Sequence, residues 1–215
     1  MEDVLAVYHQ PYNANRPVVC MDEMNRQCIK EIRPQLPMCP GTVMRYDSEY
    51  ERNGSINIFI LLEALTGKRY IKVTERRTKI DWALMIKELI DVHYPNAEKI
   101  ILIMDNLNTH TAGSLYEAFD PKTARRLYEK LEIHYTPKHG SWLNMAEIEL
   151  SALSRECLDR RLPDKETYEK EIRIWETNRN NSKGSVNWQF TAEDARLRLK
   201  RLYPKFDAIN AKTYQ

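Results

Sequence analysis

Two carboxylates stand in the sequence where a metal-dependent enzyme could use them. Asp105 directly follows the apolar run 100–104, and Asp22 follows the similar run 17–21. Short, unbroken apolar runs of this kind are typical of strands buried on both faces of a parallel sheet. Open α/β sheets bind their ligands at the carboxyl ends of such strands. Two neighbouring strands that each end in Asp would bring two carboxylates together, which favours a divalent metal site.

Phosphodiester chemistry with two metal ions needs a further acid from elsewhere in the chain. Glu147 and Glu149 are the candidates, on a helix predicted over residues 142–160. They flank its predicted buried stripe on opposite sides, so helical geometry alone does not choose between them. Glu23 adjoins Asp22 but should point to the other face of its strand, and we leave it out of the predicted site. The stripe consists of Leu143, Ala146, Leu150, Leu153 and Cys157.

The apolar periodicity predicts an α/β fold in which three strands precede the first large helix. A strand, helices, a further strand and more helices follow in turn. This order resembles that of the ribonuclease H-like fold, a mixed sheet flanked by helices in which the first and fourth strands are adjacent and parallel. Asp22 and Asp105 would then face each other. The predicted strands are 17–23, 56–62, 70–73, 100–104 and 133–136; the helices begin near residues 80, 112, 123, 142, 164 and 192; and 31–50 is predicted as loop.

The composition restricts the possible partners and compartments. The 215 residues hold 33 Lys and Arg against 31 Asp and Glu, so any binding of nucleic acid must come from local patches rather than from the charge of the whole chain. Four cysteines without a C-x-x-C spacing argue against structural zinc. Without a signal peptide or a long apolar span, they are expected to be reduced thiols in a cytoplasmic protein that does not enter a membrane.

The segment 140–147 reads Gly-Ser-Trp-Leu-Asn-Met-Ala-Glu. It resembles the Ser-Pro-x-Leu-Asn-Pro-x-Glu signature of the mariner-like D-D-E transposases. It is closer still to their bacterial insertion-sequence-630 branch, which often has Ser-Trp-Leu-Asn at this place. Three further motifs match in order, namely the Asp-Glu at the end of the first strand, Asp-Asn-x-x-x-His at 105–110, and Arg-Tyr-x-x-Glu-Tyr-x-Arg-Asn-Gly at 45–54. A late match covers 187–196.

The resemblance implies a function and a third metal ligand. In that family the Glu that closes the signature completes the site, which selects Glu147 beside Asp22 and Asp105. These residues would hold two Mg²⁺ or Mn²⁺ ions for DNA cleavage and strand transfer. The implied partners are double-stranded DNA with terminal inverted repeats, target DNA and a second copy in a homodimer. The implied location is the bacterial cytoplasm, at the nucleoid.

The resemblance also divides the chain into segments. We expect a lead-in over 1–16, the catalytic domain over 17–179, and a polar loop with a basic helix over 180–215. The spacer between Asp105 and Glu147 is longer than usual in the family, with the extra length expected at 117–126. The family's amino-terminal helix-turn-helix is absent, so the sequence resembles a catalytic domain taken from a longer transposase or half of a split reading frame.

Several residues near the predicted site have two possible roles. Asn106 and His110 could support the metal site or cap the helix that follows. Lys138 and His139 could contact a DNA phosphate or lie in a solvated loop. Glu149 is expected to be a solvated helix acid of little consequence. Two other functions also remain open, a general nuclease or resolvase of the same fold, and a decayed or domesticated transposase that only binds DNA or protein.

Overall fold

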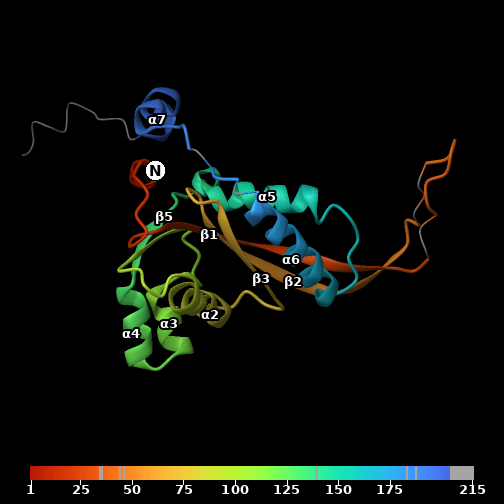
Figure 1. The fold of residues 1–215 in the computed structure, drawn as a ribbon, viewed down its shortest axis with the longest axis horizontal. Helices are drawn as coiled ribbons and strands as arrows, with labels where there is room; N and C mark the ends of the chain where they lie inside the picture. Colours follow the sequence, from red (N-terminus) through yellow and green to blue (C-terminus); the bar gives the residue numbers. More distant parts are fainter. Residues whose placement is uncertain are drawn as a thin grey trace, which may run out of the picture.

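The computed structural model describes residues 1–33, 36–43, 45, 47–138, 140–182, 184–186 and 188–203. Its centre is a mixed five-stranded sheet in the order β3-β2-β1-β4-β5 (Figure 1). The first three strands form an antiparallel meander, and β4 and β5 are added parallel to β1. The strands are β1 (Val18–Glu31), β2 (Tyr50–Glu63), β3 (Lys68–Thr74), β4 (Ile100–Met104) and β5 (Leu131–Tyr135).

Helices cover both faces of this sheet. In Figure 1, α5 and α6 lie on one face, and α2, α3 and α4 lie on the other. The helices of the first group, with the terminal ones, are α1 (Glu2–Tyr8), α5 (Met145–Glu156), α6 (Lys165–Asn181) and α7 (Ala192–Arg198). Those of the second group are α2 (Lys79–Glu88), which continues as the π-helix η1 (Leu89–His93), α3 (Ala112–Ala118) and α4 (Pro121–Glu129). Short 3₁₀ turns are η2 (Ser141–Leu143) and η3 (Lys200–Leu202).

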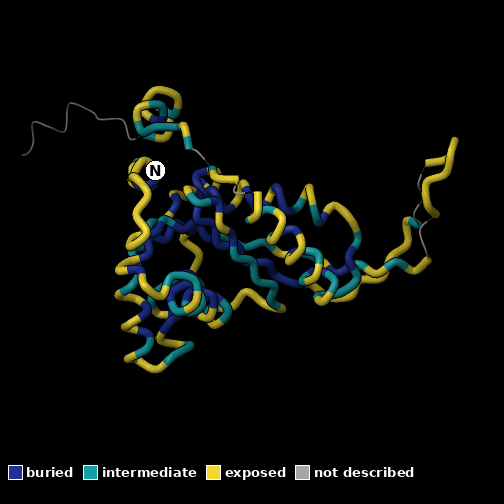
Figure 2. The backbone as a smooth tube through the Cα atoms, viewed as in Figure 1, coloured by how far each residue is buried: buried dark blue, intermediate teal, exposed yellow. Residues whose placement is uncertain are grey.

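The strands divide the interior into two apolar clusters because successive side chains point to opposite faces. Cys20, Ile101 and Ile103 belong to the cluster under α5 and α6, whereas Met21 and Met104 belong to the cluster under α2 to α4. β4 is buried along its whole length, as expected for a strand covered on both faces. Figure 2 shows this buried band running between the exposed outer surfaces of the helices.

The pairing of β1 with β4 is the feature that places the predicted acids. Val18, Val19 and Cys20 pair in parallel with Ile101, Leu102 and Ile103. The prediction that the first and fourth strands are adjacent and parallel is therefore confirmed. Asp22 and Asp105 each lie two residues beyond the last of these pairs, at the same end of the sheet.

β1 and β2 are longer than the apolar pattern predicts. Beyond residue 24 of β1 the pairing continues to Glu31 opposite Tyr50, although most of these side chains are exposed. The two strands form an arm that projects from the body of the molecule (Figure 1). Between them, the predicted loop is confirmed in its described part, where only the isolated bridges Leu36–Arg45 and Cys39–Thr42 occur.

The terminal segments pack onto the same body. Val4, Leu5 and Tyr8 of α1 and Ala195 of α7 belong to the cluster under α5. α7 begins with the predicted capping box, in which Thr191 and Asp194 satisfy each other's backbone N–H groups. In the described part of the chain, no helix is both long and apolar enough to cross a lipid bilayer.

Candidate metal site

Asp22 and Asp105 come to one end of the sheet for a simple geometric reason. Both follow runs that pair in parallel, so both backbones leave the pairing in the same direction. Asp22 shares the strand face of Cys20, under α5, because it lies two residues further along β1. Asp105 follows the last residue of β4, and its side chain is 37% exposed. It is therefore accessible to a ligand.

Glu147 is brought to this end by the cap of its helix. The Asn144 side chain accepts a hydrogen bond from the Ala146 N–H at 3.1 Å and donates one to the Met21 carbonyl at 2.8 Å. One buried amide thus begins α5 and ties it to the backbone immediately before Asp22. Tyr8 adds a second tie, a hydrogen bond from its hydroxyl to the Leu143 carbonyl at 2.6 Å. Glu147, in the first turn of α5, stays exposed.

The cap also explains one difference from the predicted helix. The apolar stripe predicts a continuous helix from residue 142, whereas the structure has the 3₁₀ turn η2 and then α5 from Met145. Asn144 has extended backbone angles and separates the two. This is the geometry of an N-cap residue, which lies outside the helix that it begins.

Asp22 lies in an acidic environment. Burial raises its pKa most, and the hydrogen bond from the Glu23 N–H lowers it. The negative charges of Glu23, Asp105 and Glu147 raise it further, and the resulting pKa is about 7. The charges of Asp105 and Glu147 therefore act on Asp22, although among the described residues the group whose ligand atoms lie within 4.8 Å of one another is Glu23, Asp105 and His110. A divalent cation would offset the repulsion between these charges, and carboxylate oxygens are the ligands that Mg²⁺ and Mn²⁺ prefer. The residues present thus fit such an ion.

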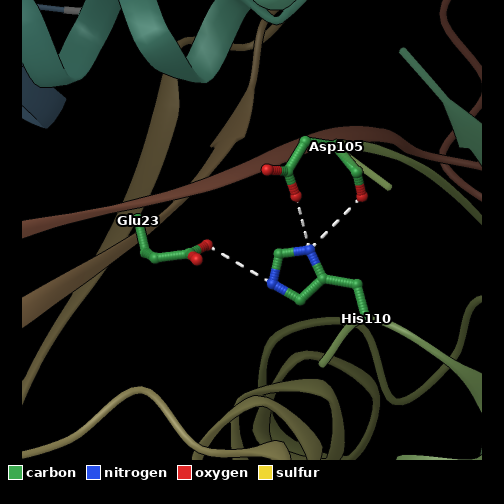
Figure 3. A group of neighbouring side chains, drawn as sticks. All are labelled: Glu23, Asp105 and His110. Atoms are coloured by element: carbon green, nitrogen blue, oxygen red, sulfur yellow. Dashed lines mark hydrogen bonds and ion pairs between the residues drawn. The ribbon is translucent and has the colours of Figure 1, made fainter. Parts of the chain in front are cut away.

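A second group adjoins the first on the other side of β1. The His110 Nδ1 atom lies 2.6 Å from Asp105 Oδ1, and its Nε2 atom lies 3.3 Å from Glu23 Oε2 (Figure 3). His110 is 1% exposed and stacks on Trp82 with 5.9 Å between the ring centres. Burial lowers the pKa of His110, but its contacts with Asp105 and Glu23 outweigh burial and raise the pKa to about 9.

This group bears on the omission of Glu23 from the predicted site and on the two interpretations of His110. Glu23 does point to the opposite face from Asp22, but its buried carboxylate meets His110 there and is part of the surroundings of the site. His110 does not cap the next helix, since α3 begins after Thr111 without a side-chain cap. In the sequence, Glu23 directly follows Asp22, and His110 closes the motif that begins at Asp105. That proximity marks both residues as neighbours of the site, but it does not indicate that they contact each other.

The remaining predicted contact residues lie on the surface. Asn106 is exposed in the loop after β4. Lys138 is exposed and lines a cavity of about 220 Å³ together with Trp142 and Leu143. Lys138 thus lies at an exposed loop position from which it could contact a phosphate. His139 lies outside the described residues.

The prediction for Glu149 is wrong. Its side chain is 2% exposed and its Oε1 accepts from Arg69 Nε at 2.6 Å and from Arg179 Nε at 2.8 Å. Arg69 is itself 1% exposed and also donates to the Gly184 carbonyl at 2.8 Å. Burial raises the pKa of Glu149, but the two guanidinium groups outweigh burial and hold the pKa below its usual value. Glu149 is therefore a buried ion-pair centre that joins α5 to β3 and α6.

Comparisons with known proteins agree with this architecture. The family model described as "DDE superfamily endonuclease" matches residues 17–169. Comparison with curated proteins gives no match. Among solved structures, the Mos1 mariner paired end complex with Mn is similar at a TM-score of 0.58 and 16% identity, covering 85% of this chain and 54% of that one. The Mos1 strand transfer complex gives 0.56 and 17%, covering 82% and 51%.

These similarities concern the fold. At such identities they show the ribonuclease H-like mixed sheet, and the predicted fold class is confirmed. The chain spans about half the length of the Mos1 chains that it matches.

Proposed function

Since the chain belongs to the DDE superfamily endonuclease family, we propose that it is the catalytic domain of a transposase that cleaves DNA and transfers strands at transposon ends. The observation that carries the proposal is geometric: the parallel pairing of β1 with β4 brings Asp22 and Asp105 to one end of the sheet, and the Asn144 side chain ties the start of α5, which carries Glu147, to the backbone beside Asp22. The similar Mos1 structures are a paired end complex with Mn, a paired-end complex with the left transposon end and a strand transfer complex, which supports the same class of reaction.

In this proposal Asp22, Asp105 and Glu147 would hold two Mg²⁺ or Mn²⁺ ions. Bound ions of this kind supply an activated water or 3′-hydroxyl and stabilise the leaving oxygen of the phosphodiester. The protein's own contribution is placement. The parallel pairing of β1 with β4 determines how Asp22 and Asp105 lie relative to each other. The Asn144 cap fixes the start of α5, and with it Glu147, relative to β1.

The finer parts of the proposal come from the sequence motifs. The run Ser-Trp-Leu-Asn at 141–144 supports the insertion-sequence-630 branch. Membership in that branch would make terminal inverted repeats the DNA substrate, a homodimer the active form, and the bacterial cytoplasm with its nucleoid the location. We further propose 17–179 as the catalytic unit, between the 1–16 lead-in and the segment 180–215.

The first test is Mn²⁺-dependent cleavage. Asp22→Asn and Asp105→Asn should each reduce nicking of a duplex carrying the element's terminal repeat by about 10³-fold, because each removes a charge that holds an ion. Asp120→Asn is the matched control, since Asp120 caps α4 at the surface and Asn caps equally well. Unchanged nicking by both variants would contradict the proposal. Equal cleavage of repeat-containing and scrambled duplexes by the parent would indicate a general nuclease instead.

A second prediction concerns DNA binding by this chain alone. With 33 basic and 31 acidic residues, contacts are expected to be few and directed to phosphates. Affinity should therefore be weak, nearly independent of sequence, and should fall steeply with salt. Fluorescence anisotropy of repeat and scrambled duplexes at several NaCl concentrations measures this. Tight binding that prefers the repeat at physiological salt would show that these residues contain a sequence-reading surface.

A further inference from the structure

Asp105 needs an anchor if it is to bind an ion in a fixed geometry. It follows the last residue of β4, and its side chain is 37% exposed, so the strand does not itself fix the carboxylate. His110 supplies such a contact. Its Nδ1 atom lies 2.6 Å from the Asp105 Oδ1 atom and 3.3 Å from the Asp105 carbonyl oxygen. The other carboxylate oxygen of Asp105 points away from the ring (Figure 3). One oxygen is thus held while the other stays available.

The imidazole is itself held from three sides. Its Nε2 atom lies 3.3 Å from Glu23 Oε2, and Trp82 stacks against the ring. The side chains of His110 and Glu23 are 1% and 3% exposed, so water does not compete effectively for these contacts. Glu23 Oε1 lies 4.0 Å from Arg77 Nη1, which gives the buried acid a nearby cation.

We infer that Glu23 and His110 are positioning residues that orient the Asp105 carboxylate toward a divalent ion. This inference rests on the proposed function, because it presupposes that Asp105 is a metal ligand. The expected arrangement is a chain of contacts from Glu23 through His110 to Asp105, in which the inner acid fixes the ring and the ring fixes the outer acid. Partners of this kind behind metal ligands typically change affinity or activity by about 10–100-fold when they are removed.

Direct coordination by the same three residues fits the geometry less well, although their ligand atoms lie within 4.8 Å of one another. Glu23 and Asp105 contact opposite nitrogens, so the ring stands between the two acids (Figure 3). The 2.6 Å separation of Nδ1 and Oδ1 is also a contact distance. Two ligands at right angles on an ion with bonds of about 2.1 Å would lie about 3.0 Å apart.

The first test measures Mn²⁺ binding by the full chain without DNA. Binding is monitored in electron paramagnetic resonance as the loss of the signal of the free ion. Glu23→Gln should raise the Kd for Mn²⁺ about 10-fold at unchanged stoichiometry. Glu63→Gln is the matched control, because Glu63 is 3% exposed in the same sheet and bonds Thr66 and Tyr94 instead. Its Kd should match the parent's whatever happens to its melting temperature.

Two substitutions of His110 separate positioning from packing. The Asn amide nitrogen occupies the place of Nδ1, whereas that of Gln occupies the place of Nε2. His110→Asn keeps a donor toward Asp105 but loses the contact with Glu23, so it should raise the Mn²⁺ Kd about 10-fold, as Glu23→Gln does, while His110→Gln loses the contact with Asp105 itself and should raise the Kd about 100-fold. Both remove the ring from Trp82, so a purely structural role would change both equally.

Each outcome decides the inference. Equal Kd values for His110→Asn and His110→Gln, or a parent-like Kd for Glu23→Gln, would overturn it. Loss of one bound ion in Glu23→Gln would also overturn it, in favour of direct coordination. Failure of the proposed function looks different, because Asp22→Asn and Asp105→Asn would then bind Mn²⁺ as the parent does.

Discussion

Glu147→Gln is expected to reduce strand cleavage by at least about 10³-fold, the consequence of losing about 4 kcal/mol of transition-state stabilisation. Gln keeps the size of Glu but removes the charge that would hold an ion. Glu147 is exposed in the first turn of α5, so folding should be almost unchanged. The measurement is the single-turnover rate of Mn²⁺-dependent nicking of a repeat-containing duplex, with the melting temperature determined on the same sample.

Glu129→Gln makes the same chemical change on another exposed helix, where Glu129 pairs with Arg125 one turn away. It should cut at the parent's rate. Cleavage by Glu147→Gln at that rate would show that the longer spacer before α5 carries a different acid to the site, or that the chemistry is not of the D-D-E type.

Glu149→Gln is expected to cost about 3–5 kcal/mol of folding free energy, because it leaves the buried Arg69 without its counter-charge. For a chain of this size that lowers the melting temperature by about 6–20 °C. Glu147 and Glu149 are two residues apart, yet we expect their substitutions to differ in effect. Glu147→Gln should reduce cleavage, and Glu149→Gln should reduce stability. Glu129→Gln is again the control, since an exposed pair contributes less than about 1 kcal/mol. A melting temperature equal to the parent's would contradict the buried network.

The ion pair of Glu149 with Arg69 also predicts how the difference in folding stability between the parent and Glu149→Gln depends on pH. The folded-state pKa of Glu149 is lowered, so its charge stabilises the fold above the unfolded-state pKa of about 4.3. That contribution disappears as the pH falls through the lower folded-state pKa. The gap in stability between parent and Glu149→Gln should therefore be constant near neutral pH and should shrink in acid. A gap that grows below pH ~4 would mean that Glu149 is not an ion-pair partner.

Local patterns predicted the frame of the fold well. The two apolar runs before Asp22 and Asp105 proved to be neighbouring parallel strands, since only a strand covered on both faces is apolar throughout. The capping box at Thr191 also formed as predicted, because its partners are three residues apart. The outer halves of β1 and β2 escaped prediction, because strands held mainly by pairing with each other need no apolar pattern.

The misjudged residues are those whose partners lie far along the chain. Glu149 has the spacing of a solvated flank residue, and only the fold brings Arg69 beside it from 80 residues earlier. Glu23 was assigned to the correct face of β1, but no local pattern shows that His110 lies across from it. The identity of the third acid, Glu147, came from a signature and remains a prediction.

The parallel pairing of Val18 with Ile101 has a consequence for biosynthesis. The β1-β2-β3 meander consists of neighbours in sequence and can form early, whereas β4 must close a loop of about 80 residues before Asp105 meets Asp22. α5 joins later still, because synthesis proceeds from the amino terminus. A ribosome-bound chain that ends before residue 145 would hold two of the three acids and lack Glu147. We expect nascent chains to be harmless to nearby DNA until α5 has emerged and docked onto β1.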